Sequence, residues 1–418
     1  MESKDLSDSI RGKIRNLISL DCGAGAPAAA AFPMAIYLIV LTCVLTHAGF
    51  GGAKVALPLH ALSLGVDPFS VGVIVALWAL CPMLIALYVG RLVDRVGPRL
   101  PMLGGAIGVV VALLVPYFFP GVAALCVMSL AVGTAFQFFF VPTQGITGAL
   151  GGLEDRARNY SLLAIGFSIA SFLGPLIAGF SIDYLGYQTA YLVLAACPAI
   201  AVLVLWFKGS LLPEAAVGTD GKQKKSSSFD LLRNANLRNA IVASGLISVA
   251  WDLYQFFFPI YGHSIGLSAS AIGTIMSMFA VAVFTIRVAL PRLARAWSEF
   301  EILLYAIGFS GAALLLFPLV RDPYLLALAS FVLGLGCGVG QPMSMLLIYS
   351  LSPTGRASEG AGLRVMFNHF THLVVPLAFG GIGTAFGFAP VFVSCSALML
   401  GGSGYGFWVE RRSARRVP

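Results

Sequence analysis

Residues 90–100 read GRLVDRVGPRL and separate two long apolar segments of the chain. The stretch holds four charged side chains, two glycines and a proline. Charged side chains are rare within membrane-spanning segments, so the role of this stretch depends on whether its neighbours cross a membrane.

The composition indicates that lipid is the solvent of most of this chain. It has 418 residues, of which 58% are hydrophobic and only 11% are charged, against about 25% charged in soluble proteins. A membrane helix needs roughly 20 mainly apolar residues. Twelve stretches meet this requirement, at residues 34–58, 69–90, 100–119, 121–148, 161–182, 188–207, 240–262, 269–290, 300–319, 324–349, 361–382 and 387–409. The cysteines show no paired spacing, so we expect no disulfide framework, no metal site and no cofactor.

The basic residues are distributed unevenly along the chain. All Lys and Arg residues except Lys54 and Arg321 lie in the N-terminal region, in the C-terminal tail, or at or near alternate turns between the apolar stretches. Cytoplasmic loops carry such an excess of positive charge, so both termini and residues 90–100 are predicted to be cytoplasmic. The net charge of +8 therefore reflects membrane topology and not a nucleic-acid partner. We expect a multi-pass protein of the bacterial inner (plasma) membrane.

The chain repeats itself at an offset of 201 residues. PLHALSLGVDPFSVG (58–72) aligns with PIYGHSIGLSASAIG (259–273), and Gly133 aligns with Gly334. An even number of spans per repeat gives two halves of parallel topology, which is a plan of transporters with a site near the membrane midplane. The predicted segments are a cytoplasmic N-terminal arm at 1–33, a six-helix bundle at 34–207, a cytoplasmic central loop at 208–239, a second six-helix bundle at 240–409 and a basic cytoplasmic tail at 410–418.

Residues 90–100 resemble the signature loop GxLxDRxGxR between the second and third helices of the major facilitator superfamily. Its positions are filled by Gly90, Leu92, Asp94, Arg95, Gly97 and Arg99. The segment GPLIAG, which contains Gly174, Pro175 and Gly179, resembles the fifth-helix motif of the drug–proton antiporter branch. The resemblance implies an all-α integral membrane fold of twelve transmembrane helices in two pseudo-symmetric six-helix bundles. It also implies that helices 1, 4, 7 and 10 line a central cavity, which helices 2, 5, 8 and 11 flank.

The charged stretch then has a physical interpretation. Gly90 and Gly97 allow a close helix approach and a tight turn, and the charge of Asp94 suits the positive N-terminal end of a neighbouring helix. The resemblance implies that this neighbour is the eleventh helix, and Arg95 and Arg99 would brace the same cytoplasmic contact when the inner gate is closed. The alternative is that the stretch is only a basic loop that sets topology.

Ionisable side chains inside the spans are candidate site residues, because placing them in lipid is costly. His47 and Lys54 lie seven residues apart on one face of the first span, and Lys54 is equivalent by the repeat to Gln255. Asp252 is the acid predicted near the membrane midplane, with Tyr254 and other aromatic residues beside it. Burial favours the neutral form of a carboxyl and a cation favours its ionised form. We therefore expect Asp252 to carry a proton, or to pair with Lys54 or a histidine.

Further candidates lie on spans 4, 10 and 11. Arg364, Asn368 and His372 share one face of span 11, and His369 and His372 are residues that can titrate near neutral pH. The remaining polar candidates are Gln137, Gln144 and Gln341. Each candidate has a structural alternative. The polar groups could form hydrogen bonds within the helix packing, and basic residues such as Arg287 and Arg364 could extend their side chains to the membrane surface.

These features predict a secondary transporter that exports a small organic solute in exchange for protons by alternating access. The excess of cations over acids in the spans favours an anionic or zwitterionic substrate. The alternatives are proton-coupled uptake of an organic anion and a non-transporting membrane sensor on the same fold, and no motif indicates an enzyme. Span 1 lacks an acid and span 4 lacks an arginine, which departs from many drug–proton antiporters and leaves the coupling site open. We expect a monomer whose partners are membrane lipid, protons and a small-molecule substrate.

Reporter fusions test the predicted topology. A fusion at Asp67 or at Arg321 should report an external location and one near Lys224 a cytoplasmic location, because the basic loops stay inside. An inverted signal at any of the three sites would contradict the topology.

Overall fold

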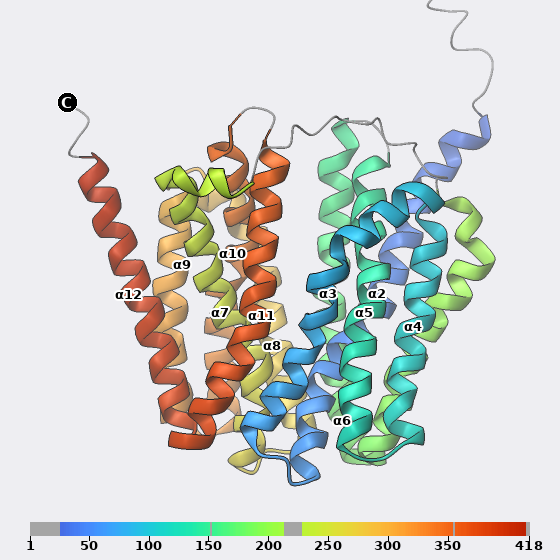
Figure 1. Ribbon diagram of the computed structural model, residues 1–418, viewed down its shortest axis with the longest axis horizontal. Helices are drawn as coiled ribbons and strands as arrows, with labels where there is room; N and C mark the ends of the chain where they lie inside the picture. The colour runs from blue at the N-terminus through green and yellow to red at the C-terminus, as the bar shows by residue number, and fades with distance from the viewer. Residues whose placement is uncertain (1–25, 151–152, 213–227, 354–355, 415–418) are drawn as a thin grey trace, which may run out of the picture.

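The computed structural model of the protein describes residues 26–150, 153–212, 228–353 and 356–414 (Figure 1). The long helices are α2 (Ala26–Ser63), α3 (Pro68–Val96), α4 (Arg99–Phe118), α5 (Val122–Ala149), α6 (Leu153–Lys208), α7 (Ala235–Ser264), α8 (Ala269–Leu293), α9 (Glu299–Leu314), α10 (Pro323–Leu351), α11 (Ala357–Phe386) and α12 (Phe388–Ala414). Short 3-10 helices are η1 (Gly209–Leu211), η2 (Ser228–Arg233) and η3 (Phe317–Leu319). The described residues contain no strand.

Helix α6 contains two membrane spans. Its 56 residues would extend about 84 Å at ~1.5 Å per residue, far more than the roughly 30 Å of a bilayer core. Gly186 interrupts the helix with φ 80° and ψ 168°, a conformation that glycine adopts without strain. The eleven described helices that are long and apolar enough to cross a membrane therefore provide twelve spans. This confirms the all-α, twelve-span fold predicted from the sequence.

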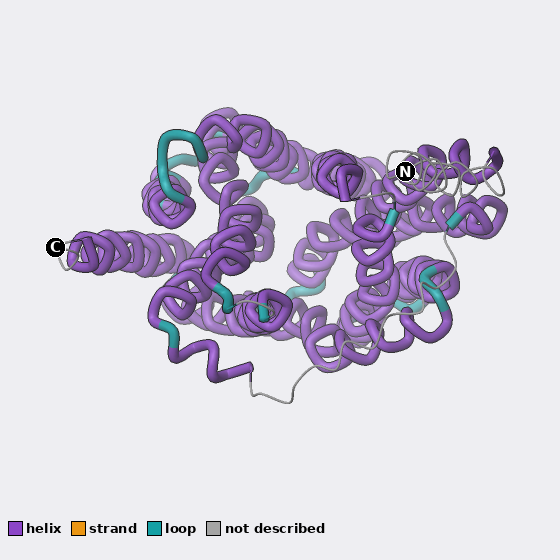
Figure 2. Tube along the Cα trace, turned by 90° about the horizontal axis from the view of Figure 1, so that it is seen from above, coloured by secondary structure: helices purple, strands orange, loops and turns teal. Residues whose placement is uncertain are grey.

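The spans form two bundles that lie side by side (Figures 1 and 2). We call the bundle of α2–α6 the N-half and the bundle of α7–α12 the C-half. The 201-residue repeat recurs in their packing. A Cβ added at Gly133 would collide with the backbone of Trp78, and one added at Gly334 would collide with the backbone of Phe279. The same close helix crossing is therefore present in both halves.

The two halves touch at the end of the molecule that lies away from the described C-terminal end. There α3 packs on α11, and α6 packs on α8. Glycines allow the backbones to meet, and a Cβ would collide with a carbonyl of the other half at Gly72 (against Pro376), Gly179 (against Ala269) and Gly273 (against Pro175). Membrane helices associate through such small-residue contacts because close packing, and not water exclusion, holds them together. The fifth-helix motif GPLIAG thus forms part of the α6–α8 crossing.

Hydrogen bonds also join the halves at this end. Asp183 of α6 accepts from the backbone N–H groups of Ala269 and Ser270 at the start of α8, at 3.1 and 2.8 Å. Thr384, its equivalent at the 201-residue offset, accepts from the N–H of Phe69 at the start of α3, at 3.0 Å. Each half therefore caps a helix N-terminus of the other, where N–H groups lack a partner within the helix.

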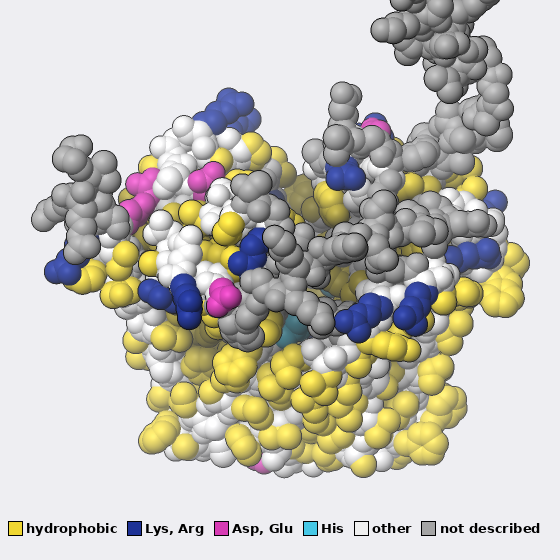
Figure 3. Space-filling view, turned by 45° about the horizontal axis from the view of Figure 1, so that its top comes forward, with side chains coloured by type: hydrophobic (Ala, Val, Ile, Leu, Met, Phe, Trp, Pro, Cys, Tyr) yellow, Lys and Arg dark blue, Asp and Glu magenta, His cyan; other side chains and the backbone are white. Residues whose placement is uncertain are grey.

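The opposite end of the molecule is open. Figure 3 looks toward this end and shows a hollow between the halves, with a histidine at its base. Lys and Arg side chains gather around it, as predicted for the cytoplasmic side. On the predicted topology, in which the basic turns are cytoplasmic, the closed end is the outer side and the open end faces the cytoplasm.

We expect Asp183→Ala to weaken the outer closure, because it removes a cap that one half provides to the other. A lost helix cap costs about 1 kcal/mol, so external labelling of Gln255→Cys in a cysteine-free background should become about fivefold faster. The measurement is the labelling rate with a membrane-impermeant thiol reagent.

The matched control for this experiment is Asp322→Ala. Asp322 caps α10 within its own half by accepting from the N–H groups of Tyr324 and Leu325. Its loss should leave the labelling rate unchanged. Equal rates in Asp183→Ala and the parent protein would show that this cap does not hold the outer side closed.

Candidate functional site

A cavity of about 410 Å³ lies between the two halves. Its walls come from α2, α3, α5 and α6 of the N-half and from α7, α8, α10 and α11 of the C-half, while no described residue of α4, α9 or α12 lines it. The volume falls in the range of small-molecule pockets, about 300–1,000 Å³. The helices around the cavity are the ones that the family resemblance implies.

The N-half wall of the cavity carries a cluster of aromatic side chains. We call Phe50, Trp78, Phe136 and Phe140 the aromatic wall. The rings of Phe50 and Phe136 are stacked with centroids 3.8 Å apart, and Trp78 meets Phe50 edge-on at 5.2 Å. His47 packs among these rings, 5.4 Å from Phe136. This side of the cavity is therefore lined by apolar rings, of which Phe50, Trp78 and Phe136 are largely buried.

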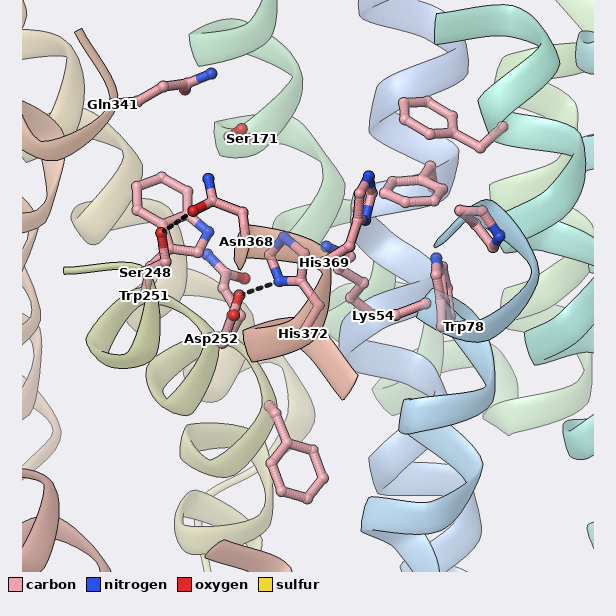
Figure 4. A pocket seen from close by; sticks show the side chains of 18 of the residues that line it. Lys54, Trp78, Ser171, Ser248, Trp251, Asp252, Gln341, Asn368, His369 and His372 are labelled. Carbon is pink, nitrogen blue, oxygen red and sulfur yellow. Dashed lines mark hydrogen bonds and ion pairs between the residues drawn. The ribbon is translucent and has the colours of Figure 1, made fainter. Parts of the chain in front are cut away.

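The C-half wall of the cavity is mainly polar. We call the following residues the polar wall: Ser244, Ser248, Asp252, Gln255, Arg287, Gln341, Ser344, Arg364, Asn368, His369 and His372. Figure 4 shows several of these side chains facing Trp78 and Lys54 of the N-half across the cavity. The two walls are therefore chemically different, although the halves share one backbone plan.

Asp252 and His372 form a hydrogen-bonded pair in the polar wall. Nδ1 of His372 lies 2.6 Å from one carboxylate oxygen of Asp252, and the hydroxyl of Thr371 lies 3.3 Å from the other (Figure 4). The hydroxyl of Ser248 donates to the side-chain oxygen of Asn368 at 3.2 Å. These contacts join α7 to α11. The histidine side chain is 39% exposed against 9% for Asp252, so the imidazole is the more accessible member of the pair.

Three further cations line the cavity. Arg364 is only 4% exposed, donates to the hydroxyl of Ser344 at 3.2 Å, and has no described hydrogen-bond partner at Nε. Arg287 donates to the carbonyl of Gly338 at a long 3.4 Å. Nζ of Lys54 lies 5.0 Å from the ring centroid of Phe50. Among the described side chains, no carboxylate lies within ion-pair distance of these three groups.

The structure brings most of the predicted site residues to one cavity. Those that line it are His47, Lys54, Gln137, Asp252, Gln255, Gln341, Arg364, Asn368, His369 and His372. Asp252 has a histidine as its hydrogen-bond partner, and a histidine was one of the two kinds of partner expected. No group of three or more metal-ligating side chains was found among the described residues.

Two predicted site residues do not line the cavity. Tyr254 is fully buried within the C-half and stacks on Phe279 at 4.5 Å. It lies two residues from Asp252, which turns it about 200° around the helix, so it faces α8. Gln144 lies two turns from Gln137 toward the C-terminal end of α5. There its backbone carbonyl accepts a hydrogen bond from the hydroxyl of Tyr160.

The aromatic wall was not predicted, although its spacing gives a signal. Phe136 and Phe140 lie on the same face of α5 as Gly133, at the i, i+3 and i+4 intervals typical of one helix face. The prediction that Arg287 extends to the membrane surface is also wrong, because this half-buried side chain lines the cavity. The same correction applies to Arg364, whose side chain is buried.

The charged stretch at 90–100 is the cytoplasmic end of α3 and the turn that follows. Gly97 ends the helix with φ 78°, and its N–H donates to the carbonyl of Val93. The close approach expected at Gly90 is absent, since an added Cβ would contact nothing within 4 Å. Arg95 and Arg99 are exposed. The Asp94 side chain lies outside the described part of the structure.

The fifth-helix motif has two contacts. Gly174 crosses α2, where an added Cβ would lie 2.8 Å from both the carbonyl of Ala48 and the nitrogen of Gly52. Pro175 lines the cavity, and its carbonyl meets Gly273 of α8. The motif therefore packs the N-half together and also touches the C-half.

The twelve-span fold and the cavity between its halves define a multi-pass membrane transporter. The profile of the Major Facilitator Superfamily matches residues 39–370, which is more than half of the chain. The protein therefore belongs to this superfamily of secondary transporters and is an integral inner-membrane protein, not an enzyme. Its substrate is a small molecule.

Named relatives and solved structures agree with this assignment. The chain is similar to the multidrug resistance protein MdtG of Klebsiella pneumoniae (strain 342), with 26% identity over 401 residues, 90% of this chain and 93% of that protein. It is 24% identical to MdtG of Dickeya zeae (strain Ech586) over 91% of this chain and 95% of that protein. A crystal structure of the peptide transporter POT shares the fold with TM-score 0.77 and 15% identity, covering 91% of this chain and 95% of that one. The nucleoside transporter NupG matches with TM-score 0.72 and 15% identity, over 90% and 98% of the two chains.

We expect Asp94→Asn to slow transport while protein level and ligand affinity stay nearly unchanged. The interaction of a carboxylate with a helix N-terminus contributes about 0.3–1 kcal/mol, so its loss from the closed inner gate should lower the initial rate roughly two- to fivefold. The measurement is transport in vesicles beside ligand-induced thermal stabilisation. The control is Asp230→Asn, which changes an exposed carboxylate in the predicted cytoplasmic loop. Normal turnover in Asp94→Asn would show that residues 90–100 have no gating role and only set the membrane topology.

Proposed function

We propose that this transporter exports a small organic solute in exchange for protons, and that Asp252 with His372 is its proton-coupling site. The observation that carries the proposal is the 2.6 Å contact of these two groups in the wall of the cavity. A carboxyl and an imidazole are both groups that can bind and release a proton. The position of the pair lets a solute reach the imidazole from the cavity.

Exchange requires that the proton and the solute bind in turn. A solute with a hydrogen-bond donor group can bind the ionised carboxylate of Asp252, and this binding competes with a proton for the same oxygen atoms. In the cytoplasm-open structure, loss of the proton therefore prepares the site for the solute. A proton that arrives from the outside would displace the solute there, which gives export.

Export is supported by two further observations. The relatives MdtG carry the printed name of multidrug resistance proteins, and export of drugs is one route to resistance. The segment GPLIAG, which resembles the fifth-helix motif of drug–proton antiporters, lies in the α6–α8 crossing that closes the outer side.

Proton-coupled uptake of an organic anion is the second candidate, because cations outnumber acids in the cavity lining. Protonation of Asp252 would remove a negative charge that repels such a solute. The proton and the anion would then bind together and move in the same direction. The two functions predict opposite pH dependences of solute affinity. Export by exchange predicts that the affinity rises with pH, and joint uptake predicts that it falls.

Asp252→Asn tests the coupling site. The neutral amide cannot gain or lose a proton, so we expect transport driven by a pH gradient to fall to the rate without a gradient, while counterflow is retained. The measurement uses proteoliposomes of known orientation and the solute that most stabilises the purified protein in a thermal-shift panel.

Asp322→Asn is the matched control, because it makes the same change at an outer helix cap and asparagine also caps helices well. If a pH gradient still drives transport in Asp252→Asn, this residue is not the coupling site, and His47, His369 and His372 are tested next. Absence of any solute movement with the parent protein would instead support a membrane sensor.

A further inference from the structure

We infer that the cavity binds amphipathic organic anions, with the carboxylate or sulfonate group at Arg364 and the ring or chain on the aromatic wall. This inference rests on the proposal that the cavity is the substrate site, but it does not depend on proton coupling or on the direction of transport. It assigns one part of the solute to each half of the protein.

Arg364 is a buried cation with no carboxylate partner among the described residues. Its side chain is 4% exposed, it makes one described hydrogen bond to a neutral hydroxyl, that of Ser344, and its Nε has no described partner. A charged group removed from water is destabilising unless it is paired and hydrogen-bonded. An anion that enters the cavity would supply the missing acceptor, and a planar guanidinium can bind a carboxylate or sulfonate through two parallel hydrogen bonds.

The charge balance of the cavity favours an anion over a cation. Lys54, Arg287 and Arg364 line it, and the described acid in the lining, Asp252, already pairs with His372. Electrostatic interactions are stronger in such a partly buried site than in water. A solute with a negative group therefore reduces the excess positive charge, whereas a cationic solute adds to it.

The aromatic wall selects the other part of the solute. Phe50 and Phe136 stack at 3.8 Å, and Phe140 lies 5.6 Å from Phe136, so their rings form a continuous apolar surface. Aromatic surfaces can also bind cations, but here Nζ of Lys54 already lies 5.0 Å from the ring centroid of Phe50. The wall is therefore suited to an uncharged ring or alkyl group.

A matched set of probes tests this inference by binding alone. Naphthalene sulfonate and naphthyl trimethylammonium share one ring and differ in charge. We measure their binding to the purified full-length protein in nonionic detergent, by thermal stabilisation and by isothermal titration, without a proton gradient. The parent protein should bind the sulfonate at least about tenfold more tightly than the trimethylammonium compound, since charge-assisted hydrogen bonds favour the anion.

Variants locate the two parts of the solute. Arg364→Gln should weaken sulfonate binding about tenfold or more and leave binding of the trimethylammonium compound unchanged or improved. Arg364→Lys keeps the charge but loses the planar guanidinium, so its loss should be smaller. Phe136→Leu should weaken sulfonate binding about threefold, because it removes a stacking ring. Arg321→Gln, which changes an exposed arginine outside the cavity, should bind like the parent.

Each outcome decides the inference. Tighter binding of the trimethylammonium compound by the parent protein, or equal sulfonate affinity in the parent and Arg364→Gln, would overturn it. If Arg364→Gln does not fold, Arg364→Lys decides the same point, since an unchanged sulfonate affinity there would show that the guanidinium is not the anion site. Sulfonate binding that depends on Arg364, without proton-driven transport, would support this inference and contradict the proposed function. Proton-driven export of the cationic probe alone would support the proposed function and contradict this inference.

Discussion

The contact between helix backbones at the outer end determines the rest of the structure. Membrane helices gain little from water exclusion and associate where small residues let them approach closely. Here Gly72 and Gly273 meet the carbonyls of Pro376 and Pro175 in the opposite half. Because the halves are joined at this end, they separate toward the other, and the space between them is the cavity. Closure outside and access from the cytoplasm are thus two consequences of one packing arrangement.

The duplicated scaffold carries a site that is not symmetric. At the 201-residue offset, Phe136 and Phe140 of the N-half correspond to Cys337 and Gln341 of the C-half, and all four line the cavity. Packing against other helices constrains the residues at the crossings, and some of these, such as Gly133 and Gly334, remain glycines in both halves. Side chains that face the cavity have no such constraint. One half can therefore present more rings and the other more charges and amides, although Lys54 and Gln137 also line the N-half side and Trp251 and Phe256 the C-half side.

The fold of this protein could be predicted from its sequence more completely than the site, for physical reasons. The length and apolarity of the spans, the basic turns and the repeat each follow from local composition, so the twelve-span fold was predictable. The ionisable residues within spans were also mostly predictable as cavity residues, because lipid disfavours them. Tyr254 was misplaced because its type suggested a role that its position on the helix does not allow. The aromatic wall was missed because phenylalanine is equally common against lipid, in the core and in a cavity.

The sequence alone determined that the chain is a membrane protein, how many times it crosses, and which charged groups lie within the spans. These properties depend on the free energy of each segment in lipid, which a segment carries by itself. Only the tertiary structure decided that Asp252 pairs with His372 and not with Lys54, that Arg364 is buried beside the neutral hydroxyl of Ser344, and which end of the molecule is closed. These facts depend on distances between residues that are far apart in the chain, and such distances are set by the way the helices of the two halves cross.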